Sequence, residues 1–219
     1  MTNSTAQAAR FVSGSVMRHV VVMTMTGAIG LMALFLVDLV DLFFLSLLDR
    51  TEITAAIGFA GTVAFINLSL SIGLGIAAAA LVARNIGAGD SETARRFATN
   101  SLVVMFAVSI VLSLLVALFA DELLGLLGAS GDALDVARFY LLTLVPGFPF
   151  LAAAINGNFS WRAIGDARRA MHSTLAVAVI NAIFDPILIF GLDMGIQGAA
   201  LASVLANITS FLIAFYGLH

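Results

Sequence analysis

The sequence predicts an all-α membrane protein with six transmembrane helices. Hydrophobic residues make up 61% of the 219 residues and charged residues only 11%, whereas soluble domains carry about 25% charged residues. The mean hydropathy is +1.09. A helix needs about 20 apolar residues to cross the bilayer core, and six segments of a single domain, residues 1–219, reach that length. These spans are roughly 19–48, 53–83, 97–120, 136–161, 170–190 and 196–217.

The arginines indicate how the chain crosses the membrane. Only Arg50 and Arg138 belong to the 1–2, 3–4 and 5–6 connections. Because basic residues concentrate on the cytoplasmic side, we expect a multi-pass protein of the plasma membrane with both termini in the cytoplasm. The other eight precede the first span or follow an even-numbered one: Arg10, Arg18, Arg84, Arg95, Arg96, Arg162, Arg168 and Arg169.

Several functional classes find no support in the sequence. The chain has no cysteine, which excludes disulfides and thiolate metal sites. We find no nucleophile–base pair, no phosphate loop and no basic patch for nucleic acid. We therefore predict neither an enzyme nor a cofactor, and the expected surroundings are the lipid bilayer and small-molecule substrates.

Three carboxylates lie inside otherwise apolar segments. Asp38 and Asp41 are in span one, and Asp185 is in span five. A charged side chain at the centre of a membrane helix costs roughly 2.5–3.5 kcal/mol on insertion scales, and such residues mark ion or substrate paths. No Arg or Lys lies at a comparable depth to neutralise them. The sequence therefore predicts a path for a cation, with Asp38 lining the substrate cavity.

The surroundings of Asp185 favour an oxygen-only cation site. Asn181 precedes it by four residues, so both side chains project from one face of span five. Pro186 lacks an N–H and frees the carbonyl of Ala182. Such oxygens suit Na⁺ or a proton. Two alternatives remain: Asp38 or Asp41 caps a bend or pairs with Arg50, and Pro186 only kinks the helix.

Other helix-bending and packing positions are visible in spans four and six. Pro146 and Pro149 predict a bend in span four. Small residues recur every four positions in span six, a spacing that lets membrane helices approach closely. The two stripes are Gly195, Ala199 and Ser203, and Gly198, Ala202 and Ala206.

Five short motifs, in order, cover nearly the whole chain and resemble the multidrug and toxic compound extrusion (MATE) family, in its archaeal and DNA-damage-inducible-like branch. They are Val40-Asp41-Leu-Phe-Phe with Ala55-Ala56-Ile-Gly58, Leu81-Val-Ala-Arg84-Asn-Ile-Gly87-Ala-Gly89-Asp90, Arg162-Ala-Ile-Gly165-Asp166-Ala-Arg-Arg-Ala-Met171, Asn181-Ala-Ile-Phe-Asp185-Pro186, and Gly195-Ile-Gln-Gly198-Ala-Ala-Leu-Ala.

The resemblance implies one lobe of a twelve-helix, two-lobe antiporter that exports cationic or amphipathic drugs and metabolites against Na⁺ or H⁺. This chain looks like the N-terminal lobe, so the second lobe is either a missing C-terminal half or the partner in a parallel homodimer. The resemblance also implies that Tyr140 and Asn158 belong to the polar cavity. The implied cation ligands are Asp41, Asn181, Asp185 and Ser203, the last in place of the commoner threonine.

One departure from the family concerns span one. Members often carry a proline there whose bending accompanies protonation, and this chain has none. Gly27 remains as a position at which the helix could bend.

Two other functions compete with export. A lipid-linked oligosaccharide or polysaccharide flippase shares the six-plus-six plan, but its anionic substrate would favour basic residues facing the cavity, and we find none in the interior of these spans. The other alternative is a six-helix membrane protein that transports nothing, which would have no need for three intramembrane acids.

Overall fold

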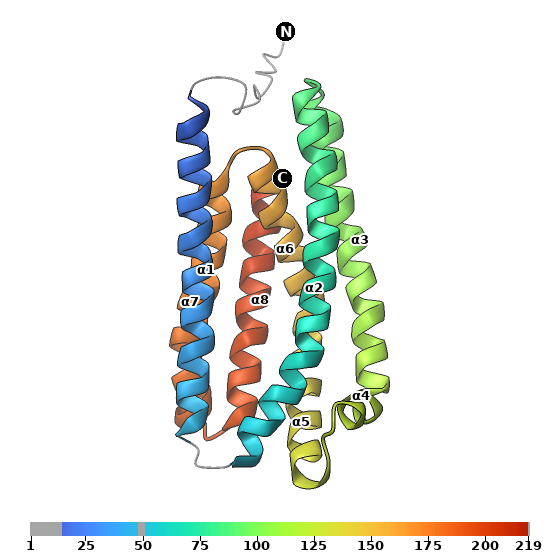
Figure 1. Cartoon of the computed structure of the whole chain (residues 1–219), viewed down its shortest axis with the longest axis vertical. Coiled ribbons are helices and arrows are strands. Elements are labelled where there is room, and N and C mark those ends of the chain that lie inside the picture. The colour runs from blue at the N-terminus through green and yellow to red at the C-terminus, as the bar shows by residue number, and fades with distance from the viewer. Residues whose placement is uncertain (1–14, 48–50, 219) are drawn as a thin grey trace.

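The computed structural model describes residues 15–47 and 51–218, and this part of the chain is a bundle of helices without a β-strand (Figure 1). Arg50, a predicted partner of Asp41, lies outside the described residues. The elements are α1 Val16–Ser46, α2 Thr51–Gly87, α3 Ser91–Leu118, α4 Ala120–Leu126, α5 Gly131–Leu144, η2 Val145–Gly147, α6 Phe148–Ala163, α7 Ala167–Pro186, η3 Ile187–Gly191 and α8 Ile196–Leu218.

Six helical segments are long and apolar enough to cross a membrane, which confirms the predicted number. Their bounds are Val16–Ser46, Ile53–Gly87, Ser91–Leu118, Gly131–Ala163, Ala167–Gly191 and Ile196–Gly217. The short helix α4 was not predicted, because seven residues carry too little periodic pattern to be recognised. It contributes the buried Ala120 and Leu124 to the core beneath α5.

Two similar turns begin α3 and α7. Gly89 and Gly165 adopt positive φ angles of 80° and 84°, which glycine tolerates without strain. The following Asp90 and Asp166 cap the next helix by accepting hydrogen bonds from the backbone N–H groups three residues on, at 2.9 and 3.3 Å. The hydrogen bonds from Thr93 hold the pKa of Asp90 below its ordinary value. Asp90 explains why α3 begins six residues before the predicted span.

The fourth span is interrupted at its prolines. The 3₁₀ turn η2, Val145–Gly147, separates α5 from α6, since neither Pro146 nor Pro149 can donate a backbone hydrogen bond. Helix α8 approaches this turn closely. A Cβ atom at Gly147 would lie 3.0 Å from a methyl group of Val204 and 3.3 Å from its Cα atom.

The fifth span changes its helical geometry at Pro186. Helix α7 ends there, and the chain continues as the π-helix η3, Ile187–Gly191, as expected where a proline breaks the regular hydrogen-bond ladder. The backbone of α8 packs directly on η3. A Cβ atom at Gly198 would lie only 2.6 Å from the carbonyl carbon of Leu188.

The small-residue stripe of α8 that contains Gly198 is buried, as the spacing predicts. Ala202 and Ala206 have no exposed surface. One turn beyond Ala206, the hydroxyl of Ser210 lies 3.0 Å from that of Ser173 on α7. Helix α8 therefore packs against both the fourth and the fifth spans.

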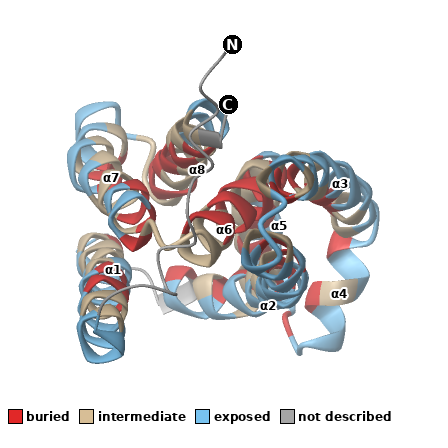
Figure 2. Ribbon diagram, turned by 90° about the horizontal axis from the view of Figure 1, so that it is seen from above, coloured by how far each residue is buried: buried red, intermediate tan, exposed pale blue. Residues whose placement is uncertain are grey.

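Helix α1 lies at the edge of the bundle, beside α7 (Figure 2). The two helices run in the same direction. Gly30 makes the contact close, since a Cβ atom there would lie 3.7 Å from the Cβ of Thr174. Only four residues of α1 are buried, among them Gly27 and Gly30.

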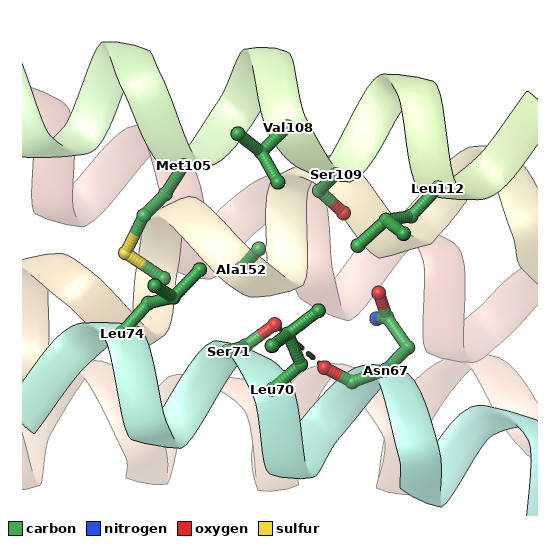
Figure 3. A pocket seen from close by; sticks show the side chains of 9 residues that line it. All are labelled: Asn67, Leu70, Ser71, Leu74, Met105, Val108, Ser109, Leu112 and Ala152. Carbon is green, nitrogen blue, oxygen red and sulfur yellow. Dashed lines mark hydrogen bonds between the residues drawn. The ribbon is translucent and has the colours of Figure 1, made fainter.

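A small pocket with three polar and six apolar lining residues lies between α2, α3 and α6 (Figure 3). Ser71 donates to the carbonyl of Asn67 at 2.8 Å. The Asn67 Nδ2 and the Ser109 hydroxyl, both buried, have no hydrogen-bond partner in the described chain. A water molecule would satisfy such groups, and the pocket is separate from the acids of α1 and α7.

The register of α1 against α7 can be tested with a disulfide. The double variant Gly30→Cys, Thr174→Cys should form one readily, because the 3.7 Å between the two Cβ positions falls within the roughly 3.5–4.5 Å that disulfides require. The natural chain has no cysteine, so labelling with a maleimide polymer before and after mild oxidation reports this pair alone. We expect both labels to disappear on oxidation.

The matched control for this pair is Gly30→Cys, Ser173→Cys. Ser173 faces Ser210 of α8 and should keep both thiols free under the same oxidant. Equal oxidation of the two pairs would contradict the register.

A second test concerns the packing contact between α8 and η3. Gly198→Ala should lower the unfolding temperature in detergent, since overpacking a tight contact costs about 1–3 kcal/mol. Gly61→Ala is the control, because a Cβ atom there meets nothing within 4 Å. Equal unfolding temperatures for the two variants would show that α8 does not pack on η3 as described.

Candidate functional site

The packing of α1 on α7 brings Asp41 and Asp185 together. Asp41 follows Gly30 by eleven residues, and Asp185 follows Thr174 by eleven. Eleven residues make three helical turns, or about 16 Å, so each acid lies on the same face of its helix as the glycine–threonine contact. The two carboxyl groups are close enough to share a hydrogen bond when one of them carries a proton.

The oxygens at this meeting point have no hydrogen-bond donor. Asp185 has no exposed surface, and neither of its carboxylate oxygens receives a hydrogen bond within the described chain. Two further oxygens also receive no hydrogen bond within the described chain. They are Oδ1 of the partly buried Asp41 and Oδ1 of Asn181, a residue that is 4% exposed. Buried acceptors without donors are costly, and a bound cation or proton would supply the missing positive charge.

An apolar layer closes the site toward the end of the bundle where α1 and α2 connect. Asp41, Asp185 and Ser203 lie one helical turn from this layer, toward the middle of the bundle. In sequence they are four residues from three of its members, which are Leu45, Ile189 and Ala199, respectively. Ser203 is partly buried. The four buried members of the layer are Leu45, Ile53, Ile189 and Ala199.

Tyr140 and Asp38 lie around the same pair of acids. Tyr140 on α5 follows Val136, which packs against the apolar layer, by four residues. Its hydroxyl is within electrostatic range of Asp41, Asp185 and Asp38. Asp38 precedes Asp41 by almost one turn and is exposed on α1. The site therefore has a fully buried acid, a partly buried acid and an exposed acid in one region.

Asn158 lies far from Tyr140, although both were expected in one polar cavity. Eighteen residues separate them along α5, η2 and α6, which is about 27 Å of helix. They cannot contact one ion together, and a common cavity would have to be elongated. Asn158 is partly buried, and its Oδ1 has no hydrogen-bond partner in the described chain.

Gly27 lies in a continuous part of α1, which runs as an α-helix from Val16 to Ser46. The helix is not broken at Gly27 in this structure, so the predicted bending position remains a prediction. What Gly27 allows here is a close approach by Arg162, whose Nη1 lies 3.2 Å from the Cβ position. This contact could not be predicted from the sequence, because Gly27 and Arg162 are distant in the chain.

Among the described residues, no three His, Cys, Asp or Glu side chains gather in an arrangement that could hold a metal ion. The candidate ligands are therefore two carboxylates with neutral oxygens of Asn181 and Ser203.

Comparison with known proteins identifies relatives over nearly the whole chain. The MatE family model matches residues 27–187. The FAD transporter of Shewanella oneidensis is 36% identical over 199 residues, which are 89% of this chain and 44% of the relative. The multidrug export protein MepA of Staphylococcus aureus is 28% identical over 190 residues, 86% of this chain and 42% of MepA. The chain thus spans less than half the length of these curated relatives.

Solved structures agree with the sequence relatives. A MOP superfamily transporter from Pyrococcus furiosus superposes with a TM-score of 0.88 and 31% sequence identity, over 99% of this chain and 47% of that one. The predicted resemblance is confirmed, as is the predicted fold of six helices from a twelve-helix, two-lobe architecture. The chain belongs to the MatE family and covers one six-helix lobe of its transporters.

Proposed function

We propose that this chain is one lobe of a cation-coupled exporter in which Asp41 and Asp185 hold Na⁺ or H⁺ together. The observation that carries the proposal is the fully buried Asp185, whose carboxyl group lies close to that of Asp41 and whose two oxygens receive no hydrogen bond in the described chain. Asn181 and Ser203 would complete the oxygen ligands. Pro186 would keep the carbonyl of Ala182 free beside them.

The coupling of cation entry to substrate export depends on the negative charge of this site. Two ionised carboxylates repel each other at short range, so a proton or Na⁺ that enters between them is stabilised by both. A membrane potential of 100 mV contributes about 2.3 kcal/mol for each charge that moves inward, which corresponds to a roughly 50-fold substrate gradient. Entry of the cation would thus drive export of the substrate.

The proposed substrates are small organic molecules of cationic or amphipathic character. The relatives with assigned substrates include a multidrug exporter and a FAD transporter, so both drugs and a large aromatic metabolite are candidates. Asp38 and Tyr140 would line the cavity near the acids, and Asn158 would line its other end. The two prolines of span four, Pro146 and Pro149, would allow that span to bend during transport.

The proposed setting is the plasma membrane with both termini in the cytoplasm. Of the eight arginines that the structure describes, all except Arg138 lie toward the end of the bundle that carries the α2–α3 and α6–α7 connections, as expected for a cytoplasmic face. Arg138 at the other end pairs with Asp121 at 2.7 Å. A second six-helix lobe would complete the transporter, either as a C-terminal half or as a second copy of this chain.

The direct test is cation binding by the purified chain. Calorimetry in detergent should detect binding of Na⁺ or release of protons on Na⁺ binding, and Asp185→Asn should weaken the affinity by at least tenfold because one of two charged ligands is lost. Repeating the titration at several pH values separates the two ions, since competition with protons weakens Na⁺ binding as the pH falls.

Asp132→Asn is the matched control, because Asp132 is an exposed acid in the first turn of α5. It should bind the cation as the wild type does. A wild-type chain that binds neither ion, under conditions in which it elutes as a folded species, would refute the proposal that this lobe holds the coupling site.

A further inference from the structure

Arg162 differs from every other arginine that the structure describes. The other seven are exposed, whereas Arg162 is partly buried at the end of α6. Its guanidinium forms no ion pair and no hydrogen bond within the described chain, although Arg96, Arg138 and Arg169 each pair with an acid. A partly buried cation without an anionic partner requires an explanation.

The guanidinium of Arg162 extends from α6 to α1. Its Nη1 lies 3.2 Å from the Cβ position of Gly27, and α1 otherwise packs mainly on α7. Gly27 is eleven residues from Val16, the first residue of α1, so α1 continues about 16 Å beyond this point. The side chain therefore occupies the space between α6 and α1, beneath the projecting end of α1.

Asn158 lies one helical turn before Arg162 on α6. Residues four apart project from the same face of a helix, and the Asn158 side chain makes no hydrogen bond within the described chain. Its buried Oδ1 is an acceptor, so Nδ2 is the atom that could donate to an anion. A guanidinium presents paired N–H groups that match the oxygens of a phosphate or carboxylate in two parallel hydrogen bonds. An amide on the next turn adds a further donor.

We propose that Arg162 and Asn158 form an oxyanion site between α6 and α1, which binds a phosphate group. As a substrate site, it rests on the proposed function and, of the substrate classes proposed there, selects amphipathic molecules that carry phosphate or a comparable oxyanion. The same chemistry is offered by the phosphate of a lipid headgroup, so the experiment distinguishes the two sources. The site also revises the sequence-based argument against anionic substrates, since the fourth span reaches Ala163 and includes Arg162.

Trp161 provides the measurement. It is the single tryptophan of the chain, it is buried against Ala170 and Ala214, and it is the residue next to Arg162. We would titrate the purified chain with inorganic pyrophosphate in an uncharged maltoside detergent, at constant Na⁺ and ionic strength, and follow Trp161 fluorescence. The wild type should show a saturable change.

Three variants make the result specific. Arg162→Gln should weaken the apparent affinity at least tenfold, and Gly27→Ala should weaken it as well, because the added methyl group displaces the guanidinium without removing its charge. Arg168→Gln, which removes an exposed arginine nearby, should leave the affinity unchanged. A fluorescence response that is the same in all variants would overturn the proposal.

A parallel titration with short-chain phosphatidylglycerol identifies the source. A response to pyrophosphate that depends on Arg162 supports a soluble oxyanion substrate, whereas an Arg162-dependent response to the lipid alone supports the site but assigns it to a headgroup and overturns the substrate reading. No Arg162-dependent response to either probe rejects the site. Asp185→Asn should bind pyrophosphate normally, so a failure of the cation site and a failure of this site are distinguishable.

Discussion

The parallel contact between α1 and α7 is the constraint on which the candidate site depends. Gly30 lets α1 approach Thr174 closely, and both helices then carry an aspartate three turns further along. A shift of one residue between the helices would rotate one carboxylate about 100° away from the other. A small-residue contact about 16 Å away from the two acids therefore sets the register that brings them together.

The change from α- to π-helix after Pro186 determines what surrounds Asp185. Because Pro186 has no N–H group, the regular backbone hydrogen bond to the carbonyl of Ala182 cannot form, almost one turn before the buried Asp185. The η3 segment also receives α8 at Gly198, where any side chain would collide with the backbone of Leu188 and Ile189. This contact brings Ser203 of α8 to the level of the acids. Within η3, Ile189 is buried against this contact, whereas Ile187 and Phe190 are 49% and 44% exposed.

Much of the fold could be predicted from the sequence, because hydropathy and length alone identify membrane spans. The six spans, the stripe of Gly198, Ala202 and Ala206, and the meeting of Asp41 with Asp185 all follow from local patterns or from resemblance. The ends of the helices could not be predicted well, because capping by Asp90 and the projecting end of α1 depend on turns and neighbours.

The position of individual side chains along the bundle, and their burial, also could not be predicted from the sequence. That Tyr140 and Asn158 line one cavity stays a prediction, and the helix between them separates their levels by about 27 Å. Arg162 resembled a loop cation because it directly follows the predicted span. Its burial results from α1 extending past the end of α6, which is a property of the assembled bundle.

The pair of acids and the Arg162 guanidinium lie near opposite ends of one face of α1. Gly27, which contacts Arg162, and Asp41 are fourteen residues apart on α1, which is about 21 Å and close to four full turns. Across this distance the Coulomb energy of two unit charges is below about 1 kcal/mol at an effective dielectric constant of about 20. Electrostatics alone therefore couples the two sites only weakly, and it would favour filling both sites together. An exporter that exchanges a cation for its substrate would instead need a conformational change that exposes the sites alternately to the two sides of the membrane.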